Sequence, residues 1–401
     1  MKNMKFLFVT NPGEGHLNPM LPMAQALQSA NHEVAFAVAP SFCSTVEAKG
    51  FRCLPAGLDW LEAEADQVFP EMRELSMDEQ GAWFIRDVFA DIAAYEMVPD
   101  LLDIGSSWHP DVLVRNDYEF GSCVAAECLG LPQATISVSF FWSEPILQRQ
   151  IGDQLAYLRS AYHLPPYPAL DMLYPYLYLT YAPSSWQPQA PAVMNAVQLA
   201  PLTWPDPGQL PAWVKALPDQ PTIYASMGTV NNRTAAAFPM IIEAFGNKAV
   251  NLILTIGQNQ DRNRWGTPPP NVYIEQYIPQ DLLFPYCDLF ITTSSFYTVI
   301  SALWHGVPVL MTPIAGDEPT QAARFADLGV GRILRRGGQL DPVLDSSIPE
   351  LSPRTLYEAA QRLFNDGIYA NNVHWVRQAL HNLPELHHGV RLLEKLAVNR
   401  S

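Results

Sequence analysis

Positive charge is scarce in this sequence. Its 401 residues include 24 Lys and Arg against 40 Asp and Glu, so the formal net charge is −16. Because a nucleic-acid duplex or an anionic membrane surface would repel such a chain, neither is expected as a partner. A site for an anionic nucleotide would therefore have to depend on local dipoles rather than on the field of the whole protein.

Cysteines are few and show no motif. The five cysteines form no CxxC pair and no Cys/His spacing typical of a metal site; they are Cys43, Cys53, Cys123, Cys128 and Cys287. An odd number without a pattern favours reduced thiols, so we expect a cytoplasmic protein with no metal site and no disulfide framework.

Long apolar runs are missing as well. No window approaches the roughly 18 uncharged apolar residues of a membrane span. The apolar run in MKNMKFLFVT (1–10) is too short for a secretory signal. Fixed-period repeats and low-complexity tracts are also lacking, which favours a globular protein. Because 401 residues are too many for one ordinary core, we expect two domains of roughly 200 residues each.

What the sequence does contain is two successions of buried strands and helices. The first half has strands expected at 4–10, 33–39, 111–116 and 133–139, with helices at 20–30 and 120–130. The second half repeats the pattern, with strands at 222–228, 251–257, 271–278 and 307–313, helices at 235–246 and 320–329, and a buried strand, a short turn and a helix within 288–310. Such βαβ units require parallel strands. We therefore predict an α/β protein with two Rossmann-like βαβ domains facing each other across a cleft.

The composition suggests where these domains begin and end. Residues 201–221 are rich in proline and are the expected linker between an N-terminal domain, 1–200, and a C-terminal domain, 222–375. Residues 376–401 are expected to form a C-terminal helix. Aromatic residues and prolines crowd the stretch 140–200, which favours extended loops and short helices there.

Candidate catalytic residues follow two strands of the first half. His16 lies in the loop GEGHLNP (13–19), where a histidine is suited to act as a general base. Asn116, Asp117 and Glu119 follow the strand at 111–115, at the same edge of the predicted sheet, so an Asp–His pair is feasible. The alternative is that His16 caps a helix and that these acidic residues are merely solvated.

Candidate phosphate and sugar contacts follow strands of the second half. Gly228 and Thr229 end one strand, and Thr293, Ser294 and Ser295 precede a helix whose N-terminus could hold a pyrophosphate. Asp317 and Glu318 could accept hydrogen bonds from sugar hydroxyls. Each group also has a purely structural interpretation, as a turn, a helix N-cap or a partner of the helix dipole.

Taken together, these segments resemble the family 1 nucleotide-sugar glycosyltransferases of GT-B fold, in particular bacterial enzymes that decorate macrolides, enediynes and aromatic polyketides. The resemblance covers nearly the whole chain. It rests on GEGHLNPMLPMAQAL (13–27), DVLVRNDYEFGSCVAAECLGLP (111–132), YASMGTV (224–230), YIPQDLLFPYCDLFIT (277–292) and HGVPVLMTPIAGDEPTQAARFADLGVG (305–331).

The resemblance implies transfer of a hexosyl group from a UDP- or TDP-sugar to a hydroxyl of a hydrophobic natural product, with inversion and without a cofactor or metal. It assigns the base to His16 and its orienting group to Asn116 or Asp117. The donor would be bound by Gly228, Thr229, Tyr277, Ile278, Pro279, Thr298, Asp317 and Glu318. Acceptor contacts would come from Trp60, Trp83, Phe84, Phe140, Phe141 and Trp142. The C-terminal helix would cross back to the first domain, and a homodimer is left open.

One motif departs from the family. Where it has His-Gly-Gly, this chain has Thr293, Ser294 and Ser295, followed by the aromatic Phe296 and Tyr297. Loss of a histidine–phosphate hydrogen bond would cost about 1.5–3 kcal/mol, or one to two orders of magnitude in donor affinity.

Three hypotheses follow from this departure. The serines, Thr229 and the helix dipole could still hold a donor diphosphate. The chain could instead be a GT-B protein repurposed for a sugar-independent cyclisation, elimination or hydrolysis. It could also be a ligand-binding auxiliary protein. Aromatic rings that fill the turn would favour the last two, and rings turned into the core would favour the first.

Overall fold

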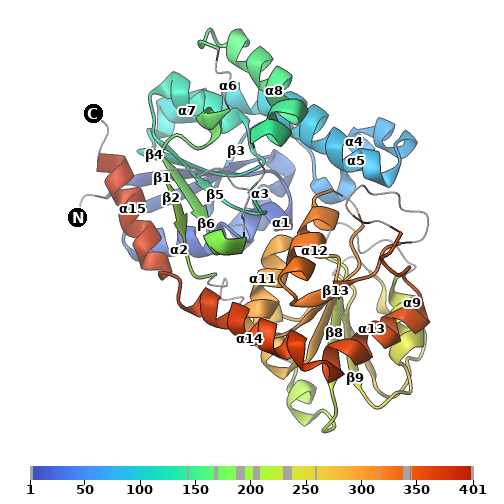
Figure 1. Ribbon diagram of the computed structural model, residues 1–401. Coiled ribbons are helices and arrows are strands. Elements are labelled where there is room, and N and C mark those ends of the chain that lie inside the picture. Colours follow the sequence, from blue (N-terminus) through green and yellow to red (C-terminus); the bar gives the residue numbers. More distant parts are fainter. Residues whose placement is uncertain are drawn as a thin grey trace. The chain divides into compact units, whose positions relative to one another are not determined.

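A computed structural model of the chain describes residues 3–141, 144–166, 170–186, 195–201, 208–228, 237–257, 260–314, 316–336, 344 and 346–398. The chain divides into two compact units, of which unit 1 is Met1–Trp204 with Leu383–Ser401 and unit 2 is Pro205–Asn382 (Figure 1). The predicted linker, 201–221, spans the first division. The second division falls later than the predicted start of the C-terminal segment at 376, because α14 (Gly367–His381) packs on α11 (Phe296–His305) within unit 2.

Unit 1 is built on one parallel sheet. Within the described residues it has seven strands in the order β3-β2-β1-β4-β5-β6-β7. They are β1 (Lys5–Val9), β2 (Glu33–Val38), β3 (Arg52–Pro55), β4 (Val112–Asn116), β5 (Gln133–Ile136), β6 (Leu177–Thr180) and β7 (Ala196–Gln198). The apolar strands at 4–10, 33–39, 111–116 and 133–139 are thus confirmed as neighbours in a parallel sheet.

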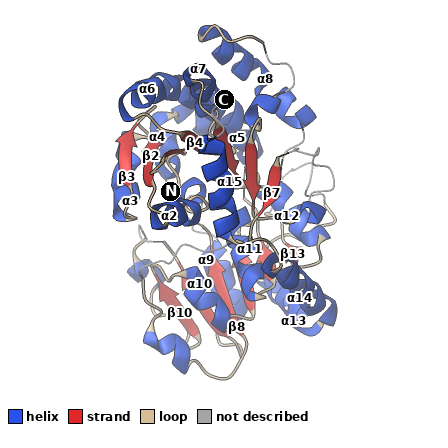
Figure 2. Ribbon diagram, turned by 90° about the vertical axis from the view of Figure 1, so that its left-hand side faces the viewer, coloured by secondary structure: helices blue, strands red, loops and turns tan. Residues whose placement is uncertain are grey.

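Helices cover this sheet on both faces (Figures 1 and 2). The α-helices of unit 1 within the described residues are α1 (Glu14–Leu17), α2 (Leu21–Ser29), α3 (Cys43–Ala48), α4 (Ala65–Val68), α5 (Met77–Trp83), α6 (Ala93–Trp108), α7 (Gly121–Leu129), α8 (Glu144–Ala161) and α15 (Leu386–Val398). Side chains alternate along β1, so Leu7 and Val9 join the core that α6 and α7 complete. Helix α15 packs on α2, where Gly389 lies against Met23, and so the chain's C-terminal helix belongs to unit 1.

Two local predictions for unit 1 were wrong. The stretch 140–200, expected as loops and short helices, contains the 18-residue helix α8. Leu147, Ile151, Leu155 and Leu158 recur at helical spacing on its buried face, and this apolar stripe outweighs the proline-rich composition of the stretch as a whole. The loop expected to hold His16 also contains a single helical turn, α1.

Unit 2 repeats the architecture. Within the described residues its six parallel strands have the order β10-β9-β8-β11-β12-β13. They are β8 (Thr222–Ser226), β9 (Asn251–Thr255), β10 (Val272–Glu275), β11 (Leu289–Thr292), β12 (Val309–Met311) and β13 (Gly331–Ile333). The helices are α9 (Ala237–Phe245), α10 (Gln280–Leu283), α11, α12 (Glu318–Asp327), α13 (Pro353–Asn365) and α14. None of the helices in the described part of the chain is long and apolar enough to cross a membrane.

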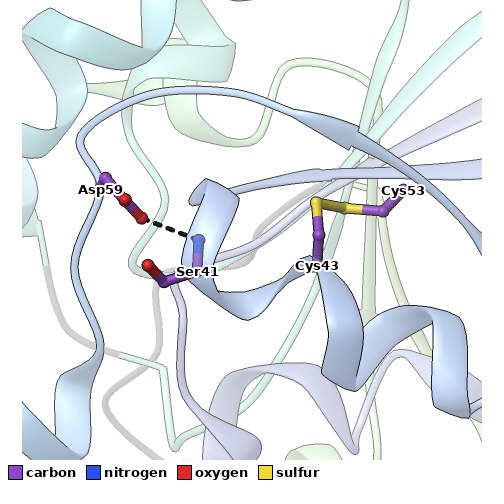
Figure 3. Close-up of a disulfide and its surroundings, with 4 residues drawn as sticks. All are labelled: Ser41, Cys43, Cys53 and Asp59. Carbon is purple, nitrogen blue, oxygen red and sulfur yellow. Dashed lines mark hydrogen bonds between the residues drawn. A yellow bond between two sulfur atoms is a disulfide. The ribbon is translucent and has the colours of Figure 1, made fainter.

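A disulfide joins Cys43 and Cys53, so the prediction of reduced thiols was wrong for this pair (Figure 3). Cys43 begins α3, which follows β2, and Cys53 lies in β3, which pairs with β2. This packing brings the two Cα atoms to 5.5 Å, a separation that a disulfide can span. An odd total of cysteines could not reveal a single pair made by tertiary contact.

Removing this disulfide should destabilise unit 1. Because the bond closes a loop with a sequence separation of 10, Cys43→Ala/Cys53→Ala should lower the free energy of unfolding by about 2–3 kcal/mol through the greater entropy of the unfolded chain. Thermal unfolding under oxidising conditions measures the effect. The exposed thiol Cys128 provides the control variant Cys128→Ala; equal melting temperatures for both proteins would contradict the prediction.

Candidate functional site

The strand order places a ligand-binding edge in each unit. In an open parallel sheet ligands bind beyond the carboxyl ends of the strands, where the strand order reverses. In unit 1 this point lies between β1 and β4, and in unit 2 between β8 and β11. His16 follows β1, Asn116 ends β4, and Gly228 and Thr293 follow β8 and β11, so the predicted site residues gather at these edges.

His16 is buried in an aromatic environment. The α1 turn carries it directly beyond β1, and 7% of its surface is exposed. The rings of Phe89 and Tyr118 meet its imidazole edge-on, with centroid distances of 5.5 and 5.8 Å. Its Nε2 lies 3.6 Å from Oε1 of Glu62. An apolar surround with one carboxylate suits a histidine that takes up a proton during a reaction.

Asn116 forms structural hydrogen bonds. Its Nδ2 donates to the Thr10 hydroxyl at 3.0 Å, and its Oδ1 accepts from the Tyr118 backbone N–H at 2.8 Å. The amide thereby joins the end of β4 to the end of β1. It also shapes the turn that presents the Tyr118 ring to His16.

Asp117 faces the end of β5. Its Oδ2 accepts a hydrogen bond from Val138 N–H at 3.2 Å. Burial raises the pKa of Asp117 to about 7, although the neighbouring Arg115 guanidinium opposes the shift. Near neutral pH this carboxyl is therefore only partly ionised, which makes it a poor partner for a histidinium.

Arg115 organises the whole β4–α7 loop. It is fully buried and donates to four carbonyl oxygens, those of Asn116, Asp117, Glu119 and Leu173, at distances of 2.7–3.3 Å. Glu119 in turn accepts from Ser122 N–H at 3.0 Å, at the start of α7. Glu119 is thus a helix-capping group rather than a solvated loop residue.

The raised pKa of Asp117 has a consequence for stability. A carboxyl that binds its proton more tightly when folded, with a pKa of about 7 against 3.8 unfolded, makes the protein less stable as the pH rises through that interval. Between pH 5 and pH 8 the wild type should lose about 2–3 kcal/mol more than Asp117→Asn, whose amide oxygen can still accept from Val138. Urea unfolding of both proteins at the two pH values measures the difference, and parallel losses would contradict it.

An aromatic cluster includes three of the predicted acceptor residues, Trp60, Trp83 and Phe84. Trp60, Phe69, Trp83, Phe84 and Phe89 form successive ring contacts with centroid distances of 5.5–6.1 Å. Phe84 and Phe89 lie on a π-helical segment, Phe84–Ile92, that leads into α6. This segment brings the cluster to His16 through Phe89.

The predicted acceptor residues differ in burial. Trp60 and Phe140 are 4% and 6% exposed, so they belong mainly to the core, whereas Trp83, Phe84 and Phe141 are partly exposed. Phe141 contacts the rings of Tyr174 and Tyr178. Trp142 lies outside the described residues.

The turn after β11 is stabilised by the side chain of Ser294. Ser294 has a φ of 81°, a left-handed conformation that normally favours glycine. Its hydroxyl is fully buried and donates to the Glu318 carbonyl at 2.9 Å, with a further short contact to the Thr293 carbonyl. Ser294 therefore has the backbone conformation of a glycine, and its hydroxyl is hydrogen-bonded to the Glu318 carbonyl.

The aromatic residues after this turn do not both point outwards. Phe296, which begins α11, is 1% exposed and lies against Phe325 of α12 at a centroid distance of 6.3 Å. Its ring is therefore part of the core of unit 2. Ser295 is the N-cap residue of α11, and Thr298, in the first turn, is partly buried. Gly228, with a φ of 71°, follows β8 and lies close to Thr293.

The remaining predicted donor residues take different roles. Tyr277 is 48% exposed, whereas Ile278 is buried and can offer a ligand little more than its backbone; Pro279 precedes α10 as its N-cap residue. Glu318 turns inwards, where its Oε2 accepts from Ile314 N–H at 2.8 Å. Asp317 accepts from the Gln321 side chain. Thr229 lies outside the described residues.

Glu62 is the site residue that the sequence did not reveal. It stands among other acids in LEAEADQ (61–67), with no pattern that distinguishes it. Its place beside His16 results from contact between two loops that are distant in sequence.

Comparison with known proteins finds similar sequences over most of the chain. Residues 240–383 match the model of the erythromycin biosynthesis protein CIII-like C-terminal domain. Among curated proteins, 4'-demethylrebeccamycin synthase of Lentzea aerocolonigenes is 27% identical over 83% of this chain and 88% of its own length. TDP-daunosamine transferase DnrS of Streptomyces peucetius is 24% identical over 84% and 86%.

Solved structures share the fold over the whole chain. Spinosyn forosaminyltransferase SpnP has a TM-score of 0.78 at 20% identity, with 99% of this chain and 100% of that chain covered. The glycosyltransferase VinC, solved in complex with dTDP, has a TM-score of 0.76 at 22% identity, with coverages of 98% and 99%. The chain thus has the GT-B fold, and its sequence is similar to an erythromycin biosynthesis protein CIII-like C-terminal domain over residues 240–383 and to bacterial natural-product glycosyltransferases over most of its length.

Proposed function

We propose that the protein transfers a hexosyl group from a UDP- or TDP-sugar to a hydroxyl of a hydrophobic natural product. The observation that carries this proposal is the position of His16, which lies beyond β1 at the switch point of the unit 1 sheet, against Phe89 and Tyr118. A base in an apolar, aromatic surround suits an acceptor of that character. The similarity to proteins named as sugar transferases, TDP-daunosamine transferase DnrS and 10-deoxymethynolide desosaminyltransferase, supports the reaction class.

In the proposed reaction His16 takes the proton of the acceptor hydroxyl. The acceptor oxygen attacks the anomeric carbon, the bond from that carbon to the diphosphate oxygen breaks, and the nucleoside diphosphate leaves with the electron pair. A single displacement of this kind inverts the configuration at the anomeric carbon. Donor binding is assigned to unit 2, with the Tyr277 ring packed on the nucleotide base and the N-terminus of α11 facing the diphosphate.

The altered phosphate turn is compatible with this proposal. The buried ring of Phe296 occupies the core of unit 2, and the hydroxyl of Ser294 is bonded to Glu318. These positions support a donor site that uses the helix dipole and backbone N–H groups in place of the family's histidine. They speak against a turn filled by both aromatic rings.

Calorimetric titration with UDP, TDP and their glucose conjugates tests the proposal. We expect micromolar binding that Tyr277→Ala weakens about tenfold, through loss of base stacking worth about 1–3 kcal/mol. Tyr286→Ala is the matched control, since Tyr286 is similarly exposed, 39% against 48%, and lies on the neighbouring turn Phe284–Tyr286. No heat up to millimolar nucleotide, from protein shown to be folded, would overturn glycosyl transfer and direct the search to a sugar-independent reaction or a bound ligand.

A further inference from the structure

We propose that Glu62 is the carboxylate that positions His16. This inference rests on the proposed role of His16 as the base. It assigns to a residue between β3 and α4 a task that the resemblance gives to the residues at the end of β4. The Nε2 of His16 lies 3.6 Å from Oε1 of Glu62, within ion-pair distance.

The backbone around Glu62 holds its side chain in this place. Glu62 begins a short 3₁₀ turn, Glu62–Glu64, and its backbone N–H donates to the Pro12 carbonyl at 3.1 Å. Its carboxylate occupies the space beside Gly13, where a Cβ atom would collide with it. The segment of Glu62 and the loop of His16 are therefore packed together by a backbone hydrogen bond and by the missing side chain of Gly13.

The chain leading to Glu62 is anchored at three further points. Cys53 of β3 is bonded to Cys43, and Asp59 accepts from Ser41 N–H at 2.7 Å (Figure 3). Gly57 N–H donates to Asp100 of α6 at 2.7 Å. Because these contacts fix the segment that carries Glu62, its carboxylate loses less conformational entropy when it orients the His16 ring than a carboxylate on a mobile loop would lose.

The side chains of Asn116 and Asp117, at the end of β4, form hydrogen bonds with residues other than His16. Asn116 is bonded to Thr10 and Tyr118, and Asp117 faces Val138 with a pKa raised by burial. The Glu62 side chain is 21% exposed and that of His16 is 9% exposed. The attraction between a partly exposed carboxylate and a mostly buried ring is only partly screened by water.

This geometry defines the task of each ring nitrogen. Nδ1 of His16 is buried, so the proton of the acceptor hydroxyl moves to Nε2. The resulting imidazolium is stabilised by the carboxylate of Glu62, whose Oε1 lies 3.6 Å from Nε2. Glu62 gains no proton and touches neither substrate, so it is a positioning residue. The distance of 3.6 Å should shorten in the substrate complex, as catalytic hydrogen bonds often do.

Glu62→Gln tests this assignment, with Glu64→Gln as the matched control on the same 3₁₀ turn. Glu62→Gln should lower kcat about 10- to 100-fold while KM for donor and acceptor stays within about twofold, because the defect affects proton transfer. Glu62→Asp, which retains the charge on a shorter side chain, should recover part of the loss. Glu64→Gln should retain wild-type kcat.

A second readout does not depend on activity. In protein labelled with ¹⁵N-histidine, the ring nitrogen signals of His16 are identified by their absence in His16→Asn. These signals should move in Glu62→Gln and not in Glu64→Gln. If they stay unchanged in Glu62→Gln, or if both glutamine variants lower kcat equally, the positioning role is wrong.

The two proposals fail separately. If no nucleotide sugar binds and no transfer occurs, glycosyl transfer is overturned, yet the His16 signals still decide whether Glu62 acts on the ring. If transfer occurs and Glu62→Gln keeps full kcat with unchanged signals, the function stands and Glu62 has no part in it.

Discussion

His16→Ala is expected to lower kcat for glycosyl transfer by about 10²–10⁴-fold. General base catalysis by a positioned side chain contributes rate factors of about that size, and alanine leaves no group to take the acceptor proton. The imidazole packs against the rings of Phe89 and Tyr118, which also contact each other, so its replacement leaves an apolar space without a new charge. Steady-state kinetics with a saturating donor measures the loss.

Donor binding provides the internal control for this variant. His16 belongs to unit 1, whereas the residues assigned to the nucleotide belong to unit 2. The Kd for UDP or TDP should therefore be the same in His16→Ala and wild type. His374→Ala, which removes an exposed histidine of α14, should leave kcat unchanged. Undiminished transfer by His16→Ala would remove the histidine from the mechanism.

Arg115→Met should be the most destabilising of the changes considered. The guanidinium is fully buried and serves the carbonyls of Asn116, Asp117, Glu119 and Leu173. Methionine fills similar space but leaves these acceptors without the donor that satisfies them in a buried loop. We expect the free energy of unfolding of unit 1 to fall by about 3–5 kcal/mol.

Arg115→Lys separates charge from geometry. A lysine keeps the cation, but a single ammonium cannot reproduce the planar set of donors that reaches the loop and Leu173 together, so only part of the stability should return. Arg149→Met on α8 is the exposed control and should change stability by less than about 0.5 kcal/mol. Calorimetric unfolding compares the proteins, and a wild-type transition in Arg115→Met would show that the loop does not need its central cation.

Much of the fold could be predicted because the strands and helices are determined by apolar patterns within short segments of the sequence. Continuous apolar runs such as 4–10 and 251–257 have the composition of strands covered on both faces, and the helices between them require a parallel arrangement. The long helix α8 was missed because its apolar stripe is embedded in a proline- and aromatic-rich region. There the average composition gave the wrong prediction, while the helical spacing of Leu147, Ile151 and Leu155 would have given the right one.

The site was predictable only in outline. Residues that follow neighbouring parallel strands come to one edge of a sheet, which is why His16 and Asn116 could be placed near each other from sequence. Which atoms they contact depends on rotamers and loop packing. The sequence could not show that Asn116 joins β4 to the end of β1 through a hydrogen bond to Thr10. Nor could it show that Ser294 adopts a backbone conformation that favours glycine and donates to the Glu318 carbonyl.

By itself the sequence determined the two parallel α/β units, the strand ends that carry the candidate residues, and the resemblance to nucleotide-sugar glycosyltransferases. Periodicity and apolar runs indicate which residues of a segment are buried, and motifs indicate that the chain shares its fold with a family. Only the tertiary structure decided that Cys43 pairs with Cys53, that Phe296 enters the core, and that Glu62 meets His16. Each of these is a contact between segments remote in sequence, created when packing brings their side chains within a few ångströms.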